Sequence, residues 1–201
     1  MGAVSEVVIV DSGGANLASL EYALARLGAR TEVTSDPQRV AGAARVILPG
    51  VGCAGDAMQR LRASGLAESL PGLTRPVLGI CLGMQLLFRH SEEGPADCLG
   101  VLHDSVQRLR AAPGRPVPHM GWNQLAIEHS DPLLEGISSG EYVYFVHGFA
   151  APVGEATLAT TDYGGPLSAV VRQNNFWGTQ FHPERSARTG ARVLANFLQL
   201  E

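Results

Sequence analysis

Short hydrophobic runs alternate with helical patterns in the first half of the chain. Four aliphatic or β-branched runs are typical of strands: residues 7–10, 31–34, 46–48 and 76–80. Three segments with apolar residues at helical spacing are predicted helices: residues 16–27, 54–66 and 82–90. This alternation of short strands and helices predicts an open parallel sheet that is covered on both faces.

The second half of the chain has a different pattern, in which turn residues separate one apolar run from the next. Such strands usually pair as hairpins or lie at a sheet edge. The predicted strands are residues 106–109, 123–127, 143–146, 157–161, 168–172 and 176–181, and residues 188–200 return to helical spacing. The sequence therefore predicts an α/β fold, with an open, mostly parallel sheet flanked by helices and an antiparallel extension.

Composition narrows the class of protein. The 201 residues are 45% hydrophobic, which suits a single domain over residues 1–201. The net charge of −4 and the lack of a basic cluster give no indication of nucleic-acid binding. No apolar run approaches the roughly 18 residues of a membrane span, and the first residues lack the basic start of a signal peptide. With three scattered cysteines, we expect a cytoplasmic protein without a disulfide framework, metal or cofactor.

A candidate nucleophile lies in the sequence Gly-Ile-Cys-Leu-Gly at residues 79–83. A cysteine between glycines, at a turn from a strand to a helix, is typical of a nucleophile elbow. The N-terminus of the following helix favours a thiolate over a thiol. Because buried cysteines are more often inert, Cys81 alone leaves catalysis and core packing as about equal alternatives.

The sequence Thr-Gln-Phe-His-Pro-Glu at residues 179–184 offers a base for this cysteine. In an extended segment His182 and Glu184 share a face, so the carboxylate can orient the imidazole. A His-x-Glu pair alone is more often an ordinary surface pair. An elbow cysteine together with a His-Pro-Glu segment at a strand end is much less common by chance, and it indicates a Cys-His-Glu triad.

These two segments resemble the catalytic signatures of class I (triad) glutamine amidotransferases. Further segments resemble the glutaminase subunits of imidazole glycerol phosphate synthases: residues 48–52, 91–94, 117–123 and 144–147. Residues 11–19 also resemble this group, although Ser12 stands where an aromatic residue is usual. The match spans almost the whole chain, and the sequence Pro-His-Met-Gly-Trp-Asn is its most specific part.

The resemblance implies a fold and an activity. It implies a parallel sheet flanked by helices, and an enzyme that hydrolyses glutamine to glutamate through a glutamyl thioester on Cys81. It also implies a heterodimer with a separate (β/α)₈ cyclase subunit. That subunit uses the ammonia to form imidazole glycerol phosphate and aminoimidazole carboxamide ribotide in histidine biosynthesis.

The tetrahedral oxyanion of such a reaction needs hydrogen-bond donors. The backbone N–H of Leu82 is one candidate, and the N–H of Val51 in the Pro-Gly-Val-Gly loop is the second. Glycines on both sides of Val51 make a peptide flip sterically easy, so we expect this hole to form only when the partner binds. An ordinary turn is the alternative interpretation of the loop.

The resemblance also suggests residues for the α-amino and carboxylate groups of glutamine: Gly52, Gln85, Gly148 and Phe149. Gln85 follows Cys81 by one helical turn and can therefore face the same pocket. Many relatives have Ser-Tyr where this chain has Gly148 and Phe149. A backbone contact would survive that difference, whereas a hydroxyl contact would not.

A contact surface for the cyclase is predicted around residues 118–122. Pro118, Met120 and Trp122, on an expected loop, are residue types that often mark an interface, with packing inside the domain as the alternative. Arg185 stands where relatives commonly have lysine, and its planar fork suits an acidic partner residue.

Three other functions remain open. Another triad amidotransferase, such as a guanylate, anthranilate or pyridoxal-phosphate synthase subunit, would share the chemistry, but residues 118–123 argue against it. Gln85 argues against an unrelated cysteine hydrolase. The intact set of Cys81, His182 and Glu184 argues against a silent scaffold.

Overall fold

The computed structural model describes residues 6–13, 17–94 and 96–201. Within these ranges the main sheet has eight strands in the order β2-β1-β3-β4-β14-β13-β12-β9. Their bounds are β1 (Glu6–Val10), β2 (Arg30–Thr34), β3 (Val46–Leu48), β4 (Val77–Ile80), β9 (Ala126–Ile127), β12 (Thr157–Asp162), β13 (Pro166–Gln173) and β14 (Phe176–Thr179). The first five strands of this order, β2, β1, β3, β4 and β14, pair in parallel. The last three, β13, β12 and β9, pair antiparallel with their neighbours.

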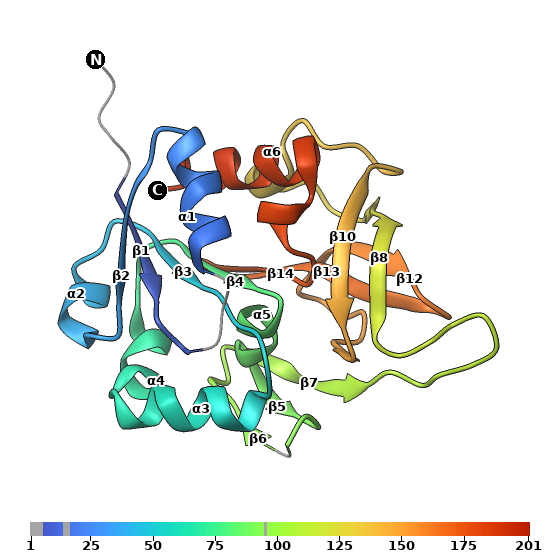
Figure 1. Cartoon of the computed structure of the whole chain (residues 1–201), viewed down its shortest axis with the longest axis horizontal. Coiled ribbons are helices and arrows are strands. Elements are labelled where there is room, and N and C mark those ends of the chain that lie inside the picture. The colour runs from blue at the N-terminus through green and yellow to red at the C-terminus, as the bar shows by residue number, and fades with distance from the viewer. Residues whose placement is uncertain (1–5, 14–16, 95) are drawn as a thin grey trace.

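Helices cover both faces of the sheet (Figure 1). Side chains of β1 alternate between the faces, as a period of two requires. Val7 and Ile9 pack with α1 (Leu17–Arg26) and α6 (Ala187–Phe197). Val8 and Val10 pack on the other face in a second core cluster. The elements of that face include α2 (Pro37–Ala41), α3 (Ala54–Ala63), α4 (Leu66–Ser69) and α5 (Leu82–Leu86). The predicted fold class is confirmed.

Two smaller sheets complete the structure. A ribbon of β8 (His119–Gln124) and β10 (Tyr142–His147) stands beside the antiparallel end of the main sheet (Figure 1). The other sheet has the order β11-β7-β5-β6. Its strands are β5 (Phe88–Ser91), β6 (Ala96–Asp97), β7 (Leu102–Arg108) and β11 (Phe149–Ala150). Short 3₁₀ turns are η1 (Leu70–Gly72), η2 (Pro132–Leu134) and η3 (Pro183–Arg185).

The predicted helix over residues 82–90 is wrong in its second half. Helix α5 ends at Leu86, and the chain continues as strand β5, which pairs with both β6 and β7. Phe88 and Ser91 are buried while Arg89 is exposed, and this spacing of three residues also suits a helix. Long-range pairing with β7 therefore decides the conformation of a segment whose local pattern is ambiguous.

The expected loop at residues 118–122 is also wrong, because residues from His119 onward form strand β8. Its partner β10 places Trp122 opposite Tyr144 and Met120 opposite Val146. The predicted strand over residues 123–127 is divided at Leu125 between β8 and β9, which belong to different sheets. The predicted helix over residues 54–66 is interrupted at Gly65, whose φ is +75°.

The carboxyl ends of three neighbouring parallel strands meet at one place. Leu48 of β3 pairs with Gly79 of β4, and Ile80 of β4 pairs with Thr179 of β14. The segments that follow these strands carry Val51, Cys81 and His182, so the topology brings them together, as open α/β sheets do at their ligand sites.

Helix α1 begins at Leu17. The predicted start at Asn16, and residues 14–16 of the 11–19 segment, lie outside the described residues. None of the helices in the described ranges is long and apolar enough to cross a membrane.

Candidate active site

Cys81 has the backbone geometry of a strained elbow. Its φ of 53° and ψ of −109° lie outside the regions that non-glycine residues ordinarily occupy. Such a conformation costs of order 1–3 kcal/mol and persists only where the surroundings enforce it. Here the Cys81 N–H donates to the Thr179 carbonyl at 2.7 Å, so β14 holds the turn from one side.

The two glycines of the elbow are required by close backbone packing. A Cβ on Gly79 would lie 2.7 Å from backbone atoms of Gly83 and Met84. A Cβ on Gly83 would lie 1.7 Å from the Leu48 carbonyl oxygen. The elbow therefore packs closely against the end of β3 and against its own helix. Neither Gly79 nor Gly83 has room for a side chain.

His182 and Glu184 form the expected pair, but the backbone between them does not have the predicted extended conformation. His182 Nδ1 lies 2.8 Å from Glu184 Oε1, and both side chains are about nine-tenths buried. The predicted extended segment is wrong, because residues 183–185 form the 3₁₀ turn η3, closed by the Ser186 hydroxyl on the His182 carbonyl. The turn brings the carboxylate back toward the ring, and the proline ring fixes its first residue.

The charge state of His182 follows from its neighbours. Burial alone would lower the pKa of His182, but the interactions with Cys81 and Glu184 outweigh it and raise the pKa to about 10. The ring is therefore an imidazolium at neutral pH. Its Nε2 is buried without a hydrogen-bond partner among the described residues, which leaves that proton for a reacting group.

A cavity of about 280 Å³ lies beside Cys81. Nine of the predicted site residues line it: Val51, Gly52, Cys81, Leu82, Gln85, Pro118, Gly148, Phe149 and His182. Glu184 and Arg185 instead border a neighbouring cavity of about 110 Å³, to which Val51 and His182 also contribute. The two cavities therefore meet at the predicted base and at the predicted oxyanion residue.

The loop that carries Val51 is fixed at both ends. The Ser12 hydroxyl donates to the Pro49 carbonyl at 2.9 Å, and the Ala54 N–H donates to Glu93 Oε2 at 3.2 Å. Between these anchors, the Val51 side chain is 37% exposed and Gly52 has a φ of +97°. Among the described residues, the N–H groups of Val51 and Leu82 donate to no other backbone group, so both remain free to bind an oxyanion.

The predicted substrate residues differ in what they can still offer. Gln85 Nε2 donates to the Phe149 carbonyl at 2.8 Å, and His147 Nδ1 contacts the same oxygen at 2.8 Å. Both lone pairs of that carbonyl are thus in use, and the Gly148 carbonyl accepts from Leu109. A carbonyl contact from Phe149 to glutamine is therefore disfavoured, whereas the Gly148 carbonyl keeps one lone pair. Gln85 Oε1 accepts no hydrogen bond from the described residues and keeps its acceptor capacity.

Glu93 is a candidate binding residue that the sequence analysis did not select. It lines the cavity with Cys81, and burial raises the pKa of its carboxyl. A carboxylate at this position is suited to the α-ammonium group of an amino acid. Its segment had been noted only as part of the resemblance to glutaminase subunits, and its position at the cavity depends on the unpredicted strand β5.

Three of the four predicted interface residues share one surface, whereas Pro118 lines the cavity beside Cys81. Met120 and Trp122 are 63% and 52% exposed on the outer side of β8. The Trp122 ring meets Tyr144 edge-on at 5.9 Å, and the Arg185 guanidinium lies 4.9 Å over the Tyr144 ring. We call the side chains of Met120, Trp122, Tyr144 and Arg185 the aromatic face; it lies directly outside the catalytic cavities.

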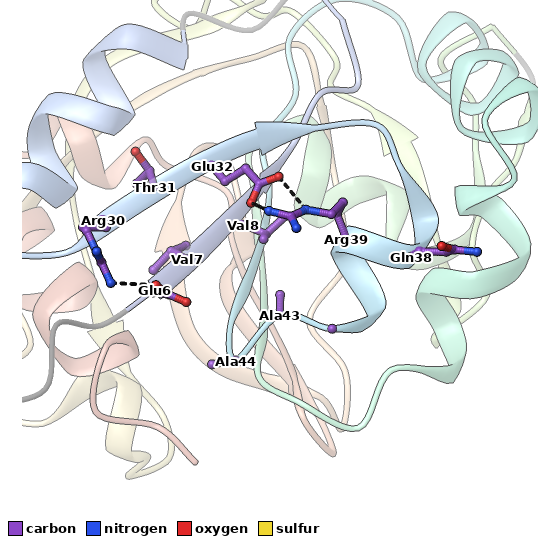
Figure 2. A pocket seen from close by; sticks show the side chains of 11 residues that line it. Glu6, Val7, Val8, Arg30, Thr31, Glu32, Gln38, Arg39, Ala43 and Ala44 are labelled. Atoms are coloured by element: carbon purple, nitrogen blue, oxygen red, sulfur yellow. Dashed lines mark hydrogen bonds and ion pairs between the residues drawn. The ribbon is translucent and has the colours of Figure 1, made fainter.

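A larger hollow, about 450 Å³, lies at the amino ends of the strands (Figure 2). Its walls carry two exposed ion pairs, between Arg30 and Glu6 and between Arg39 and Glu32. Such exposed pairs contribute little binding energy, and ligands of open α/β sheets bind at the carboxyl ends. The candidate active site is therefore the cavity beside Cys81, despite its smaller volume.

Two buried histidines pair beside the cavity, and one of them, His147, lines it. His119 Nδ1 lies 3.0 Å from His147 Nε2, and Tyr163 stacks on His119 with ring centroids 3.9 Å apart. Because Phe149 O can only accept, His147 Nδ1 is the donor and its Nε2 accepts from His119. Burial lowers the pKa of each histidine to about 4, so both rings are neutral at pH 7.

We expect acid to destabilise the protein through this pair. Between pH 6.5 and 4 the unfolded chain protonates these histidines while the folded chain does not, so the free energy of unfolding falls as pH falls. For His147 the slope is about 1.4 kcal/mol per pH unit. Urea unfolding at pH 7.5 and 5 should show a smaller difference in His147→Gln than in the wild type. The exposed His103→Gln is the control, and an unchanged slope in His147→Gln would contradict the assignment.

The fold and the site together define a class of protein. Residues 8–200 match the family described as Glutamine amidotransferase class-I. The chain belongs to this family. Among solved structures, it superposes on one described as a glutamine amidotransferase with a TM-score of 0.74 and 25% identity, covering 96% of this chain and 97% of that one. It has the same fold as PurLQS from Thermotoga maritima, with a TM-score of 0.73, 20% identity and 98% of each chain covered.

The similarity narrows to one group within the family. The chain is 55% identical over 197 residues to "Imidazole glycerol phosphate synthase subunit HisH" of Xanthomonas campestris, which covers 98% of each protein. It is 53% identical over 198 residues to the HisH subunit of Xylella fastidiosa, covering 98% of this chain and 99% of that protein. Insertions or missing segments large enough to change the fold are therefore absent from the aligned region.

Proposed function

We propose that this chain is the glutaminase subunit of an imidazole glycerol phosphate synthase. It hydrolyses glutamine and supplies the ammonia to a (β/α)₈ cyclase subunit in histidine biosynthesis, in the cytoplasm. One observation carries the chemistry: Cys81, on a strained turn, shares a cavity with the buried His182 that Glu184 orients. The acceptor is proposed from the similarity to HisH subunits, since the triad is common to the whole family.

In the first half-reaction, the Cys81 thiolate attacks the side-chain carbonyl carbon of glutamine. The negative oxygen is stabilised by the N–H of Leu82 and, once the partner has turned the loop, by the N–H of Val51. The imidazolium of His182 gives its Nε2 proton to the departing nitrogen, which leaves as ammonia. The products are a glutamyl thioester and a neutral His182.

In the second half-reaction, neutral His182 takes a proton from water as that water attacks the thioester. The carbon–sulfur bond breaks, the Cys81 thiolate leaves and glutamate is released, so the imidazolium is restored. Glu184 accepts the Nδ1–H of His182 in both states and keeps Nε2 directed toward the reaction. Its role is orientation and stabilisation of the cation.

Glutamine binding is assigned from the groups that remain available in the cavity. Glu93 provides a carboxylate and Gln85 Oε1 an acceptor for the α-ammonium group. Gly52 and the N–H groups of residues 148–149 remain as candidate donors to the α-carboxylate. This divides the predicted substrate residues into an acceptor set and a donor set.

The aromatic face is the proposed docking surface for the cyclase. It combines exposed aromatic and methionine side chains with a cation, the composition of an interface centre. It also lies over the smaller cavity, which Arg185, Val51 and His182 line together. Ammonia released at His182 would therefore leave toward the partner rather than toward solvent.

The function is tested by measuring glutamate release from the chain alone, then with a cyclase subunit and its ribonucleotide substrate. We expect low activity alone and a rise of at least about 100-fold in the complex, consistent with completion of an oxyanion hole. High activity without any partner would contradict the gated mechanism. Activation by the acceptor system of another triad amidotransferase, and not by the cyclase, would contradict the assignment.

Variants of the aromatic face refine this test. Trp122→Ala and Arg185→Glu should each weaken binding of the cyclase by about 10- to 100-fold, as truncation of central interface residues does. Tyr22→Ala is the matched control, since Tyr22 is an exposed aromatic residue on α1, outside this face. Titration of the complex gives the dissociation constants, and equal constants for all three variants would refute the surface.

A further inference from the structure

A buried glutamine contacts the sulfur of the candidate nucleophile. Gln180 follows strand β14 and is 1% exposed. Its side-chain Nε2 lies 3.8 Å from Cys81 Sγ, and its Oε1 lies 2.9 Å from Gln85 Nε2. Burial of an uncharged amide is favourable only when its donors and acceptors are paired, so these contacts explain how Gln180 is accommodated.

The direction of each hydrogen bond can be deduced from one backbone group. The Phe149 carbonyl can only accept, so the Gln85 group beside it, at 2.8 Å, must be the NH₂. The same NH₂ faces Gln180, whose nearer atom must then be the oxygen. The remaining end of Gln180, which faces Cys81, is therefore its NH₂.

We propose that Gln180 is a hydrogen-bond donor to Cys81 Sγ that stabilises the thiolate, held in this orientation by Gln85. A donor interacts more strongly with an anionic sulfur than with a neutral thiol, so it favours the charged form. The other contact has the opposite preference: Sγ lies 3.7 Å from the Val146 carbonyl, which can accept only from a thiol. Gln180 thus favours the thiolate form of Cys81, whereas the Val146 carbonyl favours the neutral thiol.

This inference deepens the proposed function, because it concerns the same nucleophile, but its test needs neither glutamine nor a partner. Iodoacetamide alkylates the thiolate, forming a carbon–sulfur bond as iodide leaves with the bonding electrons. The rate at Cys81 is measured against pH on the whole chain, with each cysteine followed by peptide mass spectrometry. Burial raises the pKa of the Cys98 thiol to about 11, so slow reaction at Cys98 also reports that the chain is folded.

Gln180→Met keeps the length of the side chain and removes the donor. We expect the pH midpoint of Cys81 alkylation to rise by at least about one unit, which lowers the rate about ten-fold at pH values below the wild-type midpoint. Gln180→Glu can still accept from Gln85 but presents a negative oxygen to the sulfur, so its midpoint should rise further. Using both variants protects the test against a failure of either one to fold.

Thr179→Val is the matched control. Thr179 is also fully buried, and its hydroxyl donates to the Phe181 carbonyl at 3.1 Å rather than to the sulfur. Its alkylation midpoint should equal that of the wild type. Unchanged midpoints in folded Gln180→Met or Gln180→Glu would overturn the role of Gln180, even with glutaminase activity intact. If the two variants show these shifts but the wild-type complex with the cyclase hydrolyses no glutamine, the proposed function alone would be contradicted.

Discussion

Replacing Cys81 with alanine should lower glutamine hydrolysis by at least about 10⁴-fold, the usual loss when a triad nucleophile is removed. The sulfur forms the thioester, and the cavity contains no other described thiol that could replace it. Glutamate release in the complex with the cyclase is the measurement. Because the proposed cyclase takes its nitrogen as ammonia, the Cys81→Ala complex should still form product from the ribonucleotide substrate when ammonium is supplied.

The comparison between nitrogen sources makes this result specific. Loss with both glutamine and ammonium would indicate a damaged complex rather than a missing nucleophile. Cys53→Ala is the control, since Cys53 immediately precedes α3 and its sulfur faces the Glu93 carbonyl. Retention of more than about 1% of the glutamine-dependent rate in Cys81→Ala would exclude Cys81 as the nucleophile.

Gly83→Ala should destabilise the protein severely, by more than about 4 kcal/mol, because the new methyl group has no space. The added Cβ would lie 1.7 Å from the Leu48 carbonyl oxygen, a backbone atom that cannot move aside as the end of a flexible side chain could. Relief would require the elbow and the end of β3 to separate, which also displaces the oxyanion loop. Chemical unfolding measures the stability, and glutaminase assays on any folded fraction should show loss of activity.

Gly72→Ala is a suitable control for this substitution. A Cβ on Gly72 meets no heavy atom within 4 Å, so its stability should change by less than about 1 kcal/mol. If Gly83→Ala were as stable as Gly72→Ala, the close packing between the elbow and β3 would be incorrect.

The parallel half of the fold was predictable because its signals are local. Aliphatic runs that end at turn residues gave β1, β3 and β4, and the glycines around Cys81 gave the elbow. Strands β5 and β8 were missed for a shared reason. Phe88 follows a helix without a breaker, and Pro118 and Gly121 suggest a loop, but pairing with β7 and β10 makes both segments strands. Such pairing depends on residues far away in the sequence.

The site shows the same division between local and long-range information. Cys81, His182 and Glu184 stand in short recognisable segments, and the structure brings the cysteine and histidine to one cavity. Gln180 stands in one of those segments too, yet its proposed role depends on an amide contact with Gln85, 95 positions away. Glu93 could be recognised as a candidate only once the position of β5, which places it at the cavity, was known. Residues whose function depends on a chain of partners cannot be found from spacing alone.

The anchoring of the proposed oxyanion loop limits how its peptides can turn when a partner binds. Ser12 and the Gly83 backbone hold the loop at Pro49 and Leu48, and Glu93 holds it at Ala54. Only residues 50–52 can then turn, and a rotating peptide between fixed points changes the direction of an N–H without moving the sulfur. The inactive and active forms would consequently have almost the same overall structure. They would differ in the direction of one peptide dipole in the loop, which the partner would set.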